Sequence, residues 1–280
     1  MTYHDRRNLA LTASSQAAVD AYDKAAELFH GYYGDPIGAL DAALADDPSL
    51  AMAHLAKAGI LLTTSEKAAE PIARAHVEAV ATQGNRLQAR ETGHVAACRA
   101  WLGGDWRRAV ELWSDVAVEH PHDALAIQLA HLGDFYLGQS AMLRNRVARV
   151  LPYWHEAMPG YGYLLGMHAF GLEECGDYAA AEREGKRAVE LNARDPVRVT
   201  FQLLDFDAKR MHYFEQLFHA TEGWVSATSE NMSLHVDMRA KKTAAFPPEV
   251  ATCLARMKAA HVRLPLPEAA GRRITMPSQD

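Results

Sequence analysis

Cysteine is scarce in this sequence, and its three cysteines lie far apart, at positions 98, 175 and 253. None forms a Cys-x-x-Cys pair, which argues against a disulfide framework or a structural zinc site. The sequence also lacks a run of about 18 apolar residues, which a membrane-spanning helix needs. Its first residues lack the apolar core and cleavage site of a signal peptide. We therefore expect a cytoplasmic protein with reduced thiols and no membrane segment.

An excess of positive charge is absent as well. The 280 residues include 29 Lys and Arg against 35 Asp and Glu, which gives a formal net charge of -6. This balance argues against a protein that binds nucleic acid through bulk charge. Hydrophobic residues make up 49% and charged residues 23%, which is ordinary for a globular protein. The length suits one large domain or two smaller ones.

The familiar catalytic motifs are also missing. The sequence has no Gly-x-Ser-x-Gly, no phosphate-binding glycine loop, no His-Glu-x-x-His and no Gly-x-Gly-x-x-Gly. His120 and His122 flank Pro121 without a third ligand, so a surface loop explains them better than a metal site. We predict no metal and no cofactor.

Two similar segments indicate an internal repeat. They are "GDWRRAVELWSDVAVEHP", residues 104–121, and "GDYAAAEREGKRAVELNARDP", residues 176–196. Each begins with Gly-Asp and an aromatic residue, and each then continues as a helix to a proline. With Gly138 between them, the glycines recur at roughly the 34-residue period of tetratricopeptide repeats.

Small residues at fixed places explain how such repeats would pack. Ala109 and Ala181 follow the repeat glycines by the same interval, and Ala97 and Ala169 precede them by the same interval. These positions let paired helices approach closely, and each hairpin must stack on its neighbours to bury its apolar face. We therefore predict a tetratricopeptide-type helical-hairpin solenoid of four or five units over residues 1–196.

The part of the sequence that contains Gly160-Tyr161-Gly162 and the run His168-Ala-Phe-Gly-Leu-Glu-Glu174 resembles the tetratricopeptide repeat protein 38-like family. The resemblance covers about residues 8–196. It implies a helical-repeat protein without an established reaction. Members of that family continue with further helices after the Asp-Pro pair, and those helices are absent here.

The pattern changes after Pro196, from a period of 3.6 residues to a period of 2. Strands are predicted over 197–204, 211–220 and 224–238, with a turn at Glu222-Gly223. On the third strand, alternation places one set of side chains on one side: Trp224, Met232, Leu234, Val236 and Met238. The other side is small or polar and carries Val225, Ala227, Asn231, Ser233, His235 and Asp237. A helix follows Pro247-Pro248, with Val250, Leu254, Met257 and His261 on one face. We predict a mainly α protein that ends in a small antiparallel meander and a helix over 197–265, with a disordered tail over 266–280.

The stretch "VRVTFQLLDFDAKRMHYFEQLFHATEGWVSATSENMSLHVDM" and the following "FPPEVATCLARMKAAH" resemble the second half of a hotdog-fold acyl-CoA thioesterase of the betainyl-CoA type. The likeness spans about residues 197–274. It implies a sheet that wraps a long helix from the first half of the fold. That first half also supplies the catalytic carboxylate, from an Asp-x-x-x-His type loop. No such strand-loop-helix unit precedes Val197.

Candidate site residues follow from these two halves. In the helical half, the concave face of a solenoid would present a partner-binding groove with His94, Gln128, Tyr163 and Glu173, near Gly166. In the strand half, Glu230 and Asn231 could line a thioesterase pocket, because thioester hydrolysis needs a carboxylate to attack or to activate water. Lys209 and Arg210 could contact the phosphates of coenzyme A.

Two functions remain open from the sequence. The first is a non-enzymatic scaffold that binds an extended peptide or partner protein along its repeats. The second is an acyl-CoA thioesterase that is completed only by oligomerisation or by a partner chain. Half of a hotdog fold would expose sheet edges and one face, so we expect a homo-oligomer formed through the sheet.

Overall fold

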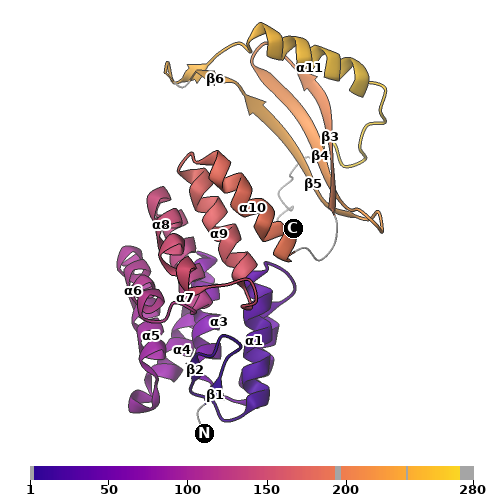
Figure 1. Ribbon diagram of the computed structural model, residues 1–280. Helices are drawn as coiled ribbons and strands as arrows, with labels where there is room; N and C mark the ends of the chain where they lie inside the picture. Colours follow the sequence, from indigo (N-terminus) through magenta and orange to yellow (C-terminus); the bar gives the residue numbers. More distant parts are fainter. Residues whose placement is uncertain (1–2, 193–196, 238, 272–280) are drawn as a thin grey trace, which may run out of the picture. The chain divides into compact units, whose positions relative to one another are not determined.

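The computed structural model describes residues 3–192, 197–237 and 239–271, and the chain divides into two compact units, residues 1–192 and 193–280 (Figure 1). The first unit is helical apart from a short hairpin, and the second holds a small sheet and one helix. The boundary predicted at Pro196 lies outside the described residues and stays a prediction. Among the described residues, no helix combines the length and apolar character needed to cross a membrane.

The first unit consists of a two-stranded hairpin and ten α-helices among its described residues. The elements are β1 Tyr3–His4, β2 Ala10–Leu11, α1 Gln16–His30, α2 Pro36–Asp46, α3 Ala51–Thr63, η1 Lys67–Ala69, α4 Glu70–Ala81, η2 Gly84–Arg86, α5 Ala89–Leu102, α6 Trp106–Glu119, α7 Ala124–Tyr136, α8 Ser140–Val150, η3 Leu151–Tyr153, α9 Tyr161–Glu174 and α10 Tyr178–Asn192.

The predicted repeat glycines mark turns between paired helices. Gly104, Gly138 and Gly176 have φ angles of 85°, 66° and 80°, a left-handed conformation in which a side chain would be strained. Each glycine therefore ends one helix and lets the chain reverse into the next. The Asp105 side chain then caps α6 by accepting a hydrogen bond from the N–H of Arg108.

Each helix of this unit packs against the next one along the chain, and the pairs α5/α6 and α9/α10 are the two hairpins predicted from the repeats. Ala97 and Ala109 are fully buried, as their predicted contact role requires. However, α1 also contacts α3 and α7, and α3 also contacts α5 and α7. The contacts of α7 with α1 and α3 join hairpins that are not consecutive, and they exceed the nearest-neighbour packing of a simple array. The solenoid character stays a prediction.

The second unit contains a three-stranded antiparallel sheet in the order β3–β4–β5, as the predicted meander requires. Its elements are β3 Val197–Phe206, β4 Arg210–His219, β5 Val225–Leu234, β6 Val236–Asp237, β7 Lys242–Thr243 and α11 Pro248–His261. The third predicted strand is thus divided into β5 and β6, because the N–H of His235 bonds to the carbonyl of Lys209 and the chain then pairs with β7.

A register shift corrects the predicted faces of the third strand. Val225 pairs with Phe218, and Ala227 pairs with Leu217, so an extra residue lies between these two pairs. The shift moves Val225 to the side that carries Met232 and Leu234, not to the side of Ala227 as predicted. Met238 lies outside the described residues.

Helix α11 packs along strand β3 and satisfies part of its outer edge. The N–H of Leu203 donates to Nδ1 of His261 at 2.9 Å, and the Lys258 ammonium donates to the carbonyl of Leu204. Leu203 and Leu254 are buried, whereas Val250 and Met257 on the predicted helix face stay partly exposed. Part of one edge of the sheet is therefore covered by the chain itself.

The first residues of the C-terminal tail, which was predicted to be disordered, are ordered in the structure. Residues 268–271 form a turn, and Gly271 donates its N–H to the Glu230 carboxylate at 2.7 Å. The rest of the predicted disordered tail, residues 272–280, lies outside the described residues.

Candidate functional site

The register of the sheet assigns its side chains to two faces. Gln202, Phe214 and Glu230 pair in line across β3, β4 and β5, so they share one face, called here the Glu230 face. Leu203, Tyr213 and Asn231 pair in line one residue away and share the opposite face, called here the Asn231 face.

A histidine and a carboxylate pair on the Glu230 face. His212 of β4 lies diagonal to Glu230 of β5, and its Nε2 is 2.7 Å from Oε1 of Glu230. Because an ionised carboxylate only accepts, Nε2 carries the proton and Nδ1 of a neutral His212 is left as an acceptor. The hydrogen bond from Gly271 and then the one from His212 lower the pKa of Glu230. The carboxylate is therefore ionised at neutral pH.

The C-terminal segment crosses the Glu230 face. At strand β3, the Gln202 side chain donates to the carbonyl of Pro265. At strand β5, on the same face, the N–H of Gly271 donates to Glu230. Phe214 stands between Gln202 and Glu230 in the register and is only 2% exposed. Residues 265–271 therefore form a strap over this face, and the strap positions Glu230.

Asn231 lies on the other face and does not meet Glu230. Its Nδ2 donates to Oγ of Ser229 at 2.8 Å and to Oε2 of Glu215 at 3.4 Å. The structure thus separates the two candidates of the strand half, because neighbours along a strand point to opposite sides. The sequence prediction missed both His212 and Glu215. Finding these two residues requires the pairing register of the strands, which the sequence alone does not give.

Lys209 lies in the turn between β3 and β4, and Arg210 is the first residue of β4. Asp207 accepts the backbone N–H groups of both residues, and its Oδ2 lies 2.6 Å from the Arg210 guanidinium. The Arg210 side chain and then these backbone N–H groups lower the pKa of Asp207 to about 2. Arg210 is therefore already neutralised by a carboxylate, and Lys209 is the exposed cation of this turn. A phosphate contact by either residue stays a prediction.

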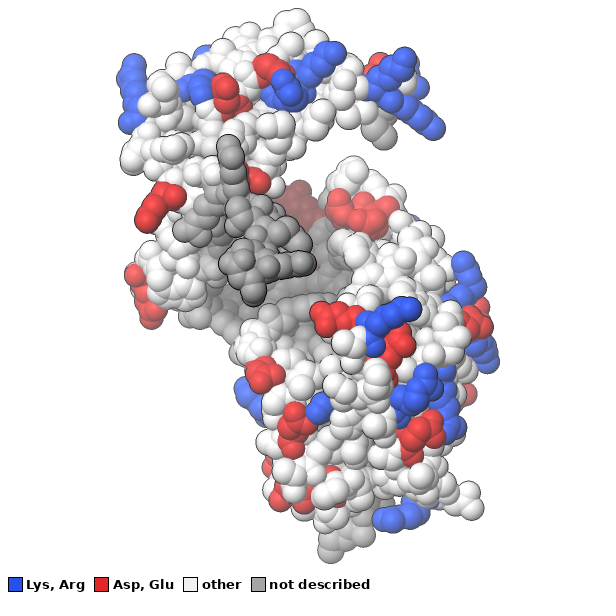
Figure 2. All heavy atoms as spheres, turned by 180° about the vertical axis from the view of Figure 1, so that it is seen from behind, with Lys and Arg blue, Asp and Glu red and all other residues white. Residues whose placement is uncertain are grey.

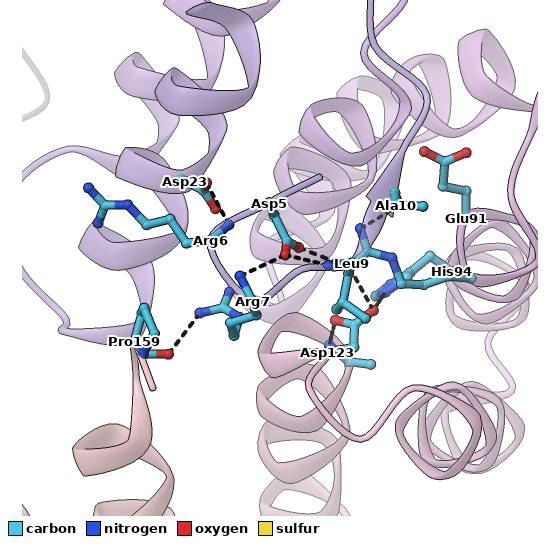
Figure 3. A network of polar contacts seen from close by, with 12 residues as sticks. Asp5, Arg6, Arg7, Leu9, Ala10, Asp23, Glu91, His94, Asp123 and Pro159 are labelled. Carbon is cyan, nitrogen blue, oxygen red and sulfur yellow. Dashed lines mark hydrogen bonds and ion pairs between the residues drawn. The ribbon is translucent and has the colours of Figure 1, made fainter. Parts of the chain in front are cut away.

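His94 of the helical unit is not on an open groove. It is fully buried, and its Nε2 lies 2.9 Å from Oδ2 of Asp123. Arg90, one turn earlier on α5, contacts both Asp5 and Asp123, at 3.3 and 3.6 Å. Figure 3 shows these two carboxylates together with His94. These side chains join the N-terminal hairpin to α5 and to the first residue before α7.

The electrostatics of this buried cluster favour charged partners. Burial opposes ionisation of Asp123, but His94 and Arg90 together keep its pKa well below the ordinary value. Burial likewise opposes the charge of Arg90, and the surrounding Asp123, Tyr22 and Asp5 raise its pKa. The Asp123 side chain also caps α7 through the N–H of Ala126. The cluster links the N-terminal hairpin to α5 and α7, and the spacing of these residues in the sequence does not predict that contact.

Gln128 is also buried, and it holds His30 of α1. Its Oε1 contacts Nδ1 of His30, and its Nε2 reaches the carbonyl of Phe29 at 3.5 Å. The predicted location of His94 and Gln128 on an accessible concave face is therefore corrected, because α1 and the N-terminal hairpin fill that space. Tyr163 is half-buried and lines a cavity with His30, and Glu173 is exposed. Partner binding by Tyr163 or Glu173 stays a prediction.

Charged side chains are mixed in sign on the face of the helical unit that Figure 2 draws. Within the described part of the chain, no group of three His, Cys, Asp or Glu side chains could hold a metal ion.

Comparison with known proteins concerns the C-terminal region. Residues 178–254 match the model of the thioesterase-like superfamily, so the match begins in α10 and runs through the sheet into α11. This region carries a thioesterase-like domain. The family match covers less than a third of the chain, and it starts earlier than the resemblance predicted from residue 197.

Relatives with assigned activities share this domain. A stretch of 111 residues is 36% identical to an L-carnitine dehydrogenase/betainyl-CoA thioesterase of Rhizobium meliloti, over 40% of this chain and 22% of that protein. A stretch of 81 residues is 40% identical to a betainyl-CoA thioesterase of Pseudomonas aeruginosa, over 29% of this chain and 51% of that protein. The chain thus spans about a quarter to a half of the relatives that it matches. No solved structure matches.

These comparisons place the thioesterase-like domain among homologues of betainyl-CoA thioesterases. They lend no support to the resemblance of residues 8–196 to the tetratricopeptide repeat protein 38-like family, which stays a prediction. They also favour the second of the two functions left open by the sequence over a scaffold without catalysis.

Proposed function

We propose that this protein hydrolyses acyl-CoA thioesters, with betainyl-CoA as the first substrate to test, and that a second copy of the chain completes the site. The observation that carries the proposal is the similarity of the C-terminal region to betainyl-CoA thioesterases. The His212–Glu230 pair on the sheet supplies a chemically suitable group within that region.

His212 and Glu230 suit the activation of water. Glu230 holds the Nε2 proton of His212, so Nδ1 can accept a proton from water while Glu230 stabilises the imidazolium that forms. The resulting hydroxide attacks the thioester carbonyl carbon. The carbon–sulfur bond then breaks, and the thiolate of coenzyme A leaves with the proton from His212. The products are a carboxylic acid and free coenzyme A.

A second copy is proposed because the sheet is incomplete by itself. Strand β5 is an edge strand, and side chains on both faces of the sheet are exposed, with Val197 and Val199 on one and Met232 and Leu234 on the other. Apolar side chains and an unpaired edge of this kind favour association. A second chain would cover them and exclude water from the reacting thioester.

The test is thioester hydrolysis by the purified chain, followed through the free thiol of coenzyme A. Betainyl-CoA and acetyl-CoA are compared, and His212→Gln and Glu230→Gln are each expected to lower kcat/KM at least about 100-fold. Glu215→Gln is the matched control, because it removes a carboxylate from the opposite face of the same sheet. Its expected effect is less than about threefold.

Four results would count against parts of the proposal. Absence of turnover on both thioesters would overturn hydrolysis itself. Loss of activity in Glu215→Gln with retention in Glu230→Gln would move the site to the Asn231 face. Activity that elutes with the monomer in size-exclusion chromatography would overturn the role of a second copy, and activity only with an added protein would assign completion to a different chain.

A further inference from the structure

A cavity of about 230 Å³ lies within the helical unit, beside the N-terminal hairpin and helices α1 and α9. Its wall includes Arg6, Arg7, Asp23, Glu27, His30 and Tyr163. A space of this size suits a small molecule better than a peptide segment. Four of these side chains are charged, so their ion pairing shows which charges a ligand in the cavity could neutralise.

Two of the four charges neutralise each other. The Arg6 guanidinium lies 3.4 Å from the Glu27 carboxylate, and Lys24 also approaches Glu27 at 4.0 Å. Tyr33 donates its hydroxyl to the same carboxylate at 2.9 Å. Glu27 therefore already has cationic and neutral donors, and Arg6 has its counter-charge.

Arg7 has no carboxylate within ion-pair distance among the described residues. Its Nη1 donates to the carbonyl of Pro159 at 3.3 Å (Figure 3), and its Nε is buried without a hydrogen-bond partner. A guanidinium can form paired hydrogen bonds to a carboxylate or phosphate. Arg7 thus offers an unused cationic donor at the cavity wall.

Asp23 is the complementary case. It is buried, it accepts the backbone N–H of Arg6 at 2.9 Å, and no cation lies within ion-pair distance of it in the described part of the chain. Burial and then the negative charge of Asp5 raise the pKa of Asp23 to about 6. Its negative charge is therefore incompletely compensated, and an incoming cation would be favourable.

His30 supplies a neutral acceptor in the same wall. Its Nδ1 contacts the Gln128 carbonyl oxygen, so Nδ1 carries the proton and Nε2 is an acceptor. Nε2 is buried without a partner in the structure, and burial lowers the pKa of His30 to about 3. The ring lies 6.4 Å from that of Tyr163, which also lines the cavity.

We infer that this cavity binds a small zwitterion of the amino-acid class, with its carboxylate on Arg7, its ammonium group on Asp23 and a further N–H or O–H donated to His30. Among the described residues, one cation and one anion without counter-ions and one acceptor without a donor line a single small space. A ligand with one anionic group, one cationic group and a donor satisfies all three. This site belongs to the helical unit and is independent of thioester hydrolysis by the C-terminal unit.

The test is calorimetric titration of the full-length protein with single amino acids at neutral pH, beginning with glycine, serine and glutamate. Acetate and ethylamine serve as half-probes that carry one charge each. At least one amino acid is expected to bind at millimolar concentration or tighter, at least about tenfold more tightly than either half-probe. Failure of all amino acids up to about 10 mM overturns the proposal, and so does equal binding of acetate.

Variants then locate the site. Arg7→Gln and Asp23→Asn are each expected to weaken binding at least about tenfold, whereas Arg7→Lys keeps the charge and should weaken it less. Arg108→Gln is the matched control, because it removes a cation that is paired with Glu111 and does not line the cavity. Circular dichroism confirms folding of each variant. Binding unchanged in Arg7→Gln, or lost equally in Arg108→Gln, contradicts the assignment.

Discussion

Gly171 of α9 lies against the backbone of Arg144 in α8, so close that an added Cβ would stand 2.4 Å from the Arg144 nitrogen. Backbone atoms cannot move aside as a side-chain end can, so the two helices would have to separate. Gly166 in the same helix is different, because a Cβ there would meet only the Cβ of Ala188, at 4.0 Å.

The two glycines therefore respond in opposite directions to the same substitution. Gly171→Ala should lower the free energy of unfolding by about 1–3 kcal/mol through overpacking. Gly166→Ala should raise it by up to about 1 kcal/mol, because glycine is unfavourable inside a helix. Urea denaturation followed by circular dichroism measures both values. Equal effects of the two changes would contradict the close contact of α8 and α9.

The buried cluster around Arg90 predicts a large loss of stability when one anion is removed. Asp123→Ala leaves the guanidinium with fewer partners and removes the cap of α7, so it should cost about 3–5 kcal/mol. Asp35→Ala is the control, because Asp35 caps α2 at an exposed position, and it should cost about 1 kcal/mol. The measurement is urea denaturation followed by tryptophan fluorescence. Costs within about 1 kcal/mol of each other would show that the ion pairs add little.

His30 predicts loss of stability in acid. Burial lowers the pKa of His30 in the folded protein to about 3, below the ordinary value of 6.5. Its contribution is complete above pH 6.5 and is lost as the pH falls towards 3, because the unfolded chain binds the proton first. Below pH 6.5, the free energy of unfolding of His30→Gln should therefore fall less steeply than that of the unsubstituted protein. The two slopes should differ by about 1.4 kcal/mol per pH unit.

Tryptophan fluorescence in a Trp224→Phe background reports this change for the helical unit alone, since the other four tryptophans lie at positions 101, 106, 113 and 154. Asp23 acts in the opposite sense, because its raised pKa favours the folded state in acid. It contributes equally to both proteins and cancels in the comparison. Parallel pH profiles would contradict a buried, neutral His30.

The edge of the sheet gives a local prediction. His261→Leu removes the acceptor of the Leu203 N–H, and the loss of one such hydrogen bond is worth about 0.5–1.5 kcal/mol. Hydrogen exchange at Leu203 should accelerate by several-fold to about tenfold, while exchange within β4 changes little. Met257→Leu is the control on the same helix. Unchanged exchange at Leu203 would show that α11 does not close this edge.

Regular periodicity explains what the sequence predicted well. Alternation from Val197 gave β3, and bulky side chains on both faces of residues 211–220 gave β4, each to within about two residues. The Gly-Asp pairs gave the turns before α6 and α10. These patterns are local, because each strand or turn is encoded by its own residues. The side of Val225 was wrong, since one extra residue in β5 shifts the alternation without any sequence mark.

Long-range contacts explain what the sequence did not predict. The strands β1 and β2 contain two residues each and carry no periodicity. Asp5 and Arg90 meet across 85 positions, and His30 and Gln128 across 98. For this reason, His94 and Gln128 were expected on an open face, although α1 and the hairpin cover them. Glu230 was predicted as a candidate, but its partner His212 depends on strand register.

The buried tie between the N-terminal hairpin and α5 and α7 has a consequence for how this unit can evolve. In an array whose repeats touch only their neighbours, a repeat can be duplicated or deleted and the rest still folds. Here the ion pair between Asp5 and Arg90 joins segments that are separated by four α-helices, so a change in the number of these helices would have to preserve that contact. The helical unit should accordingly unfold in a single cooperative transition. Gain or loss of a repeat between the two residues would disrupt their contact.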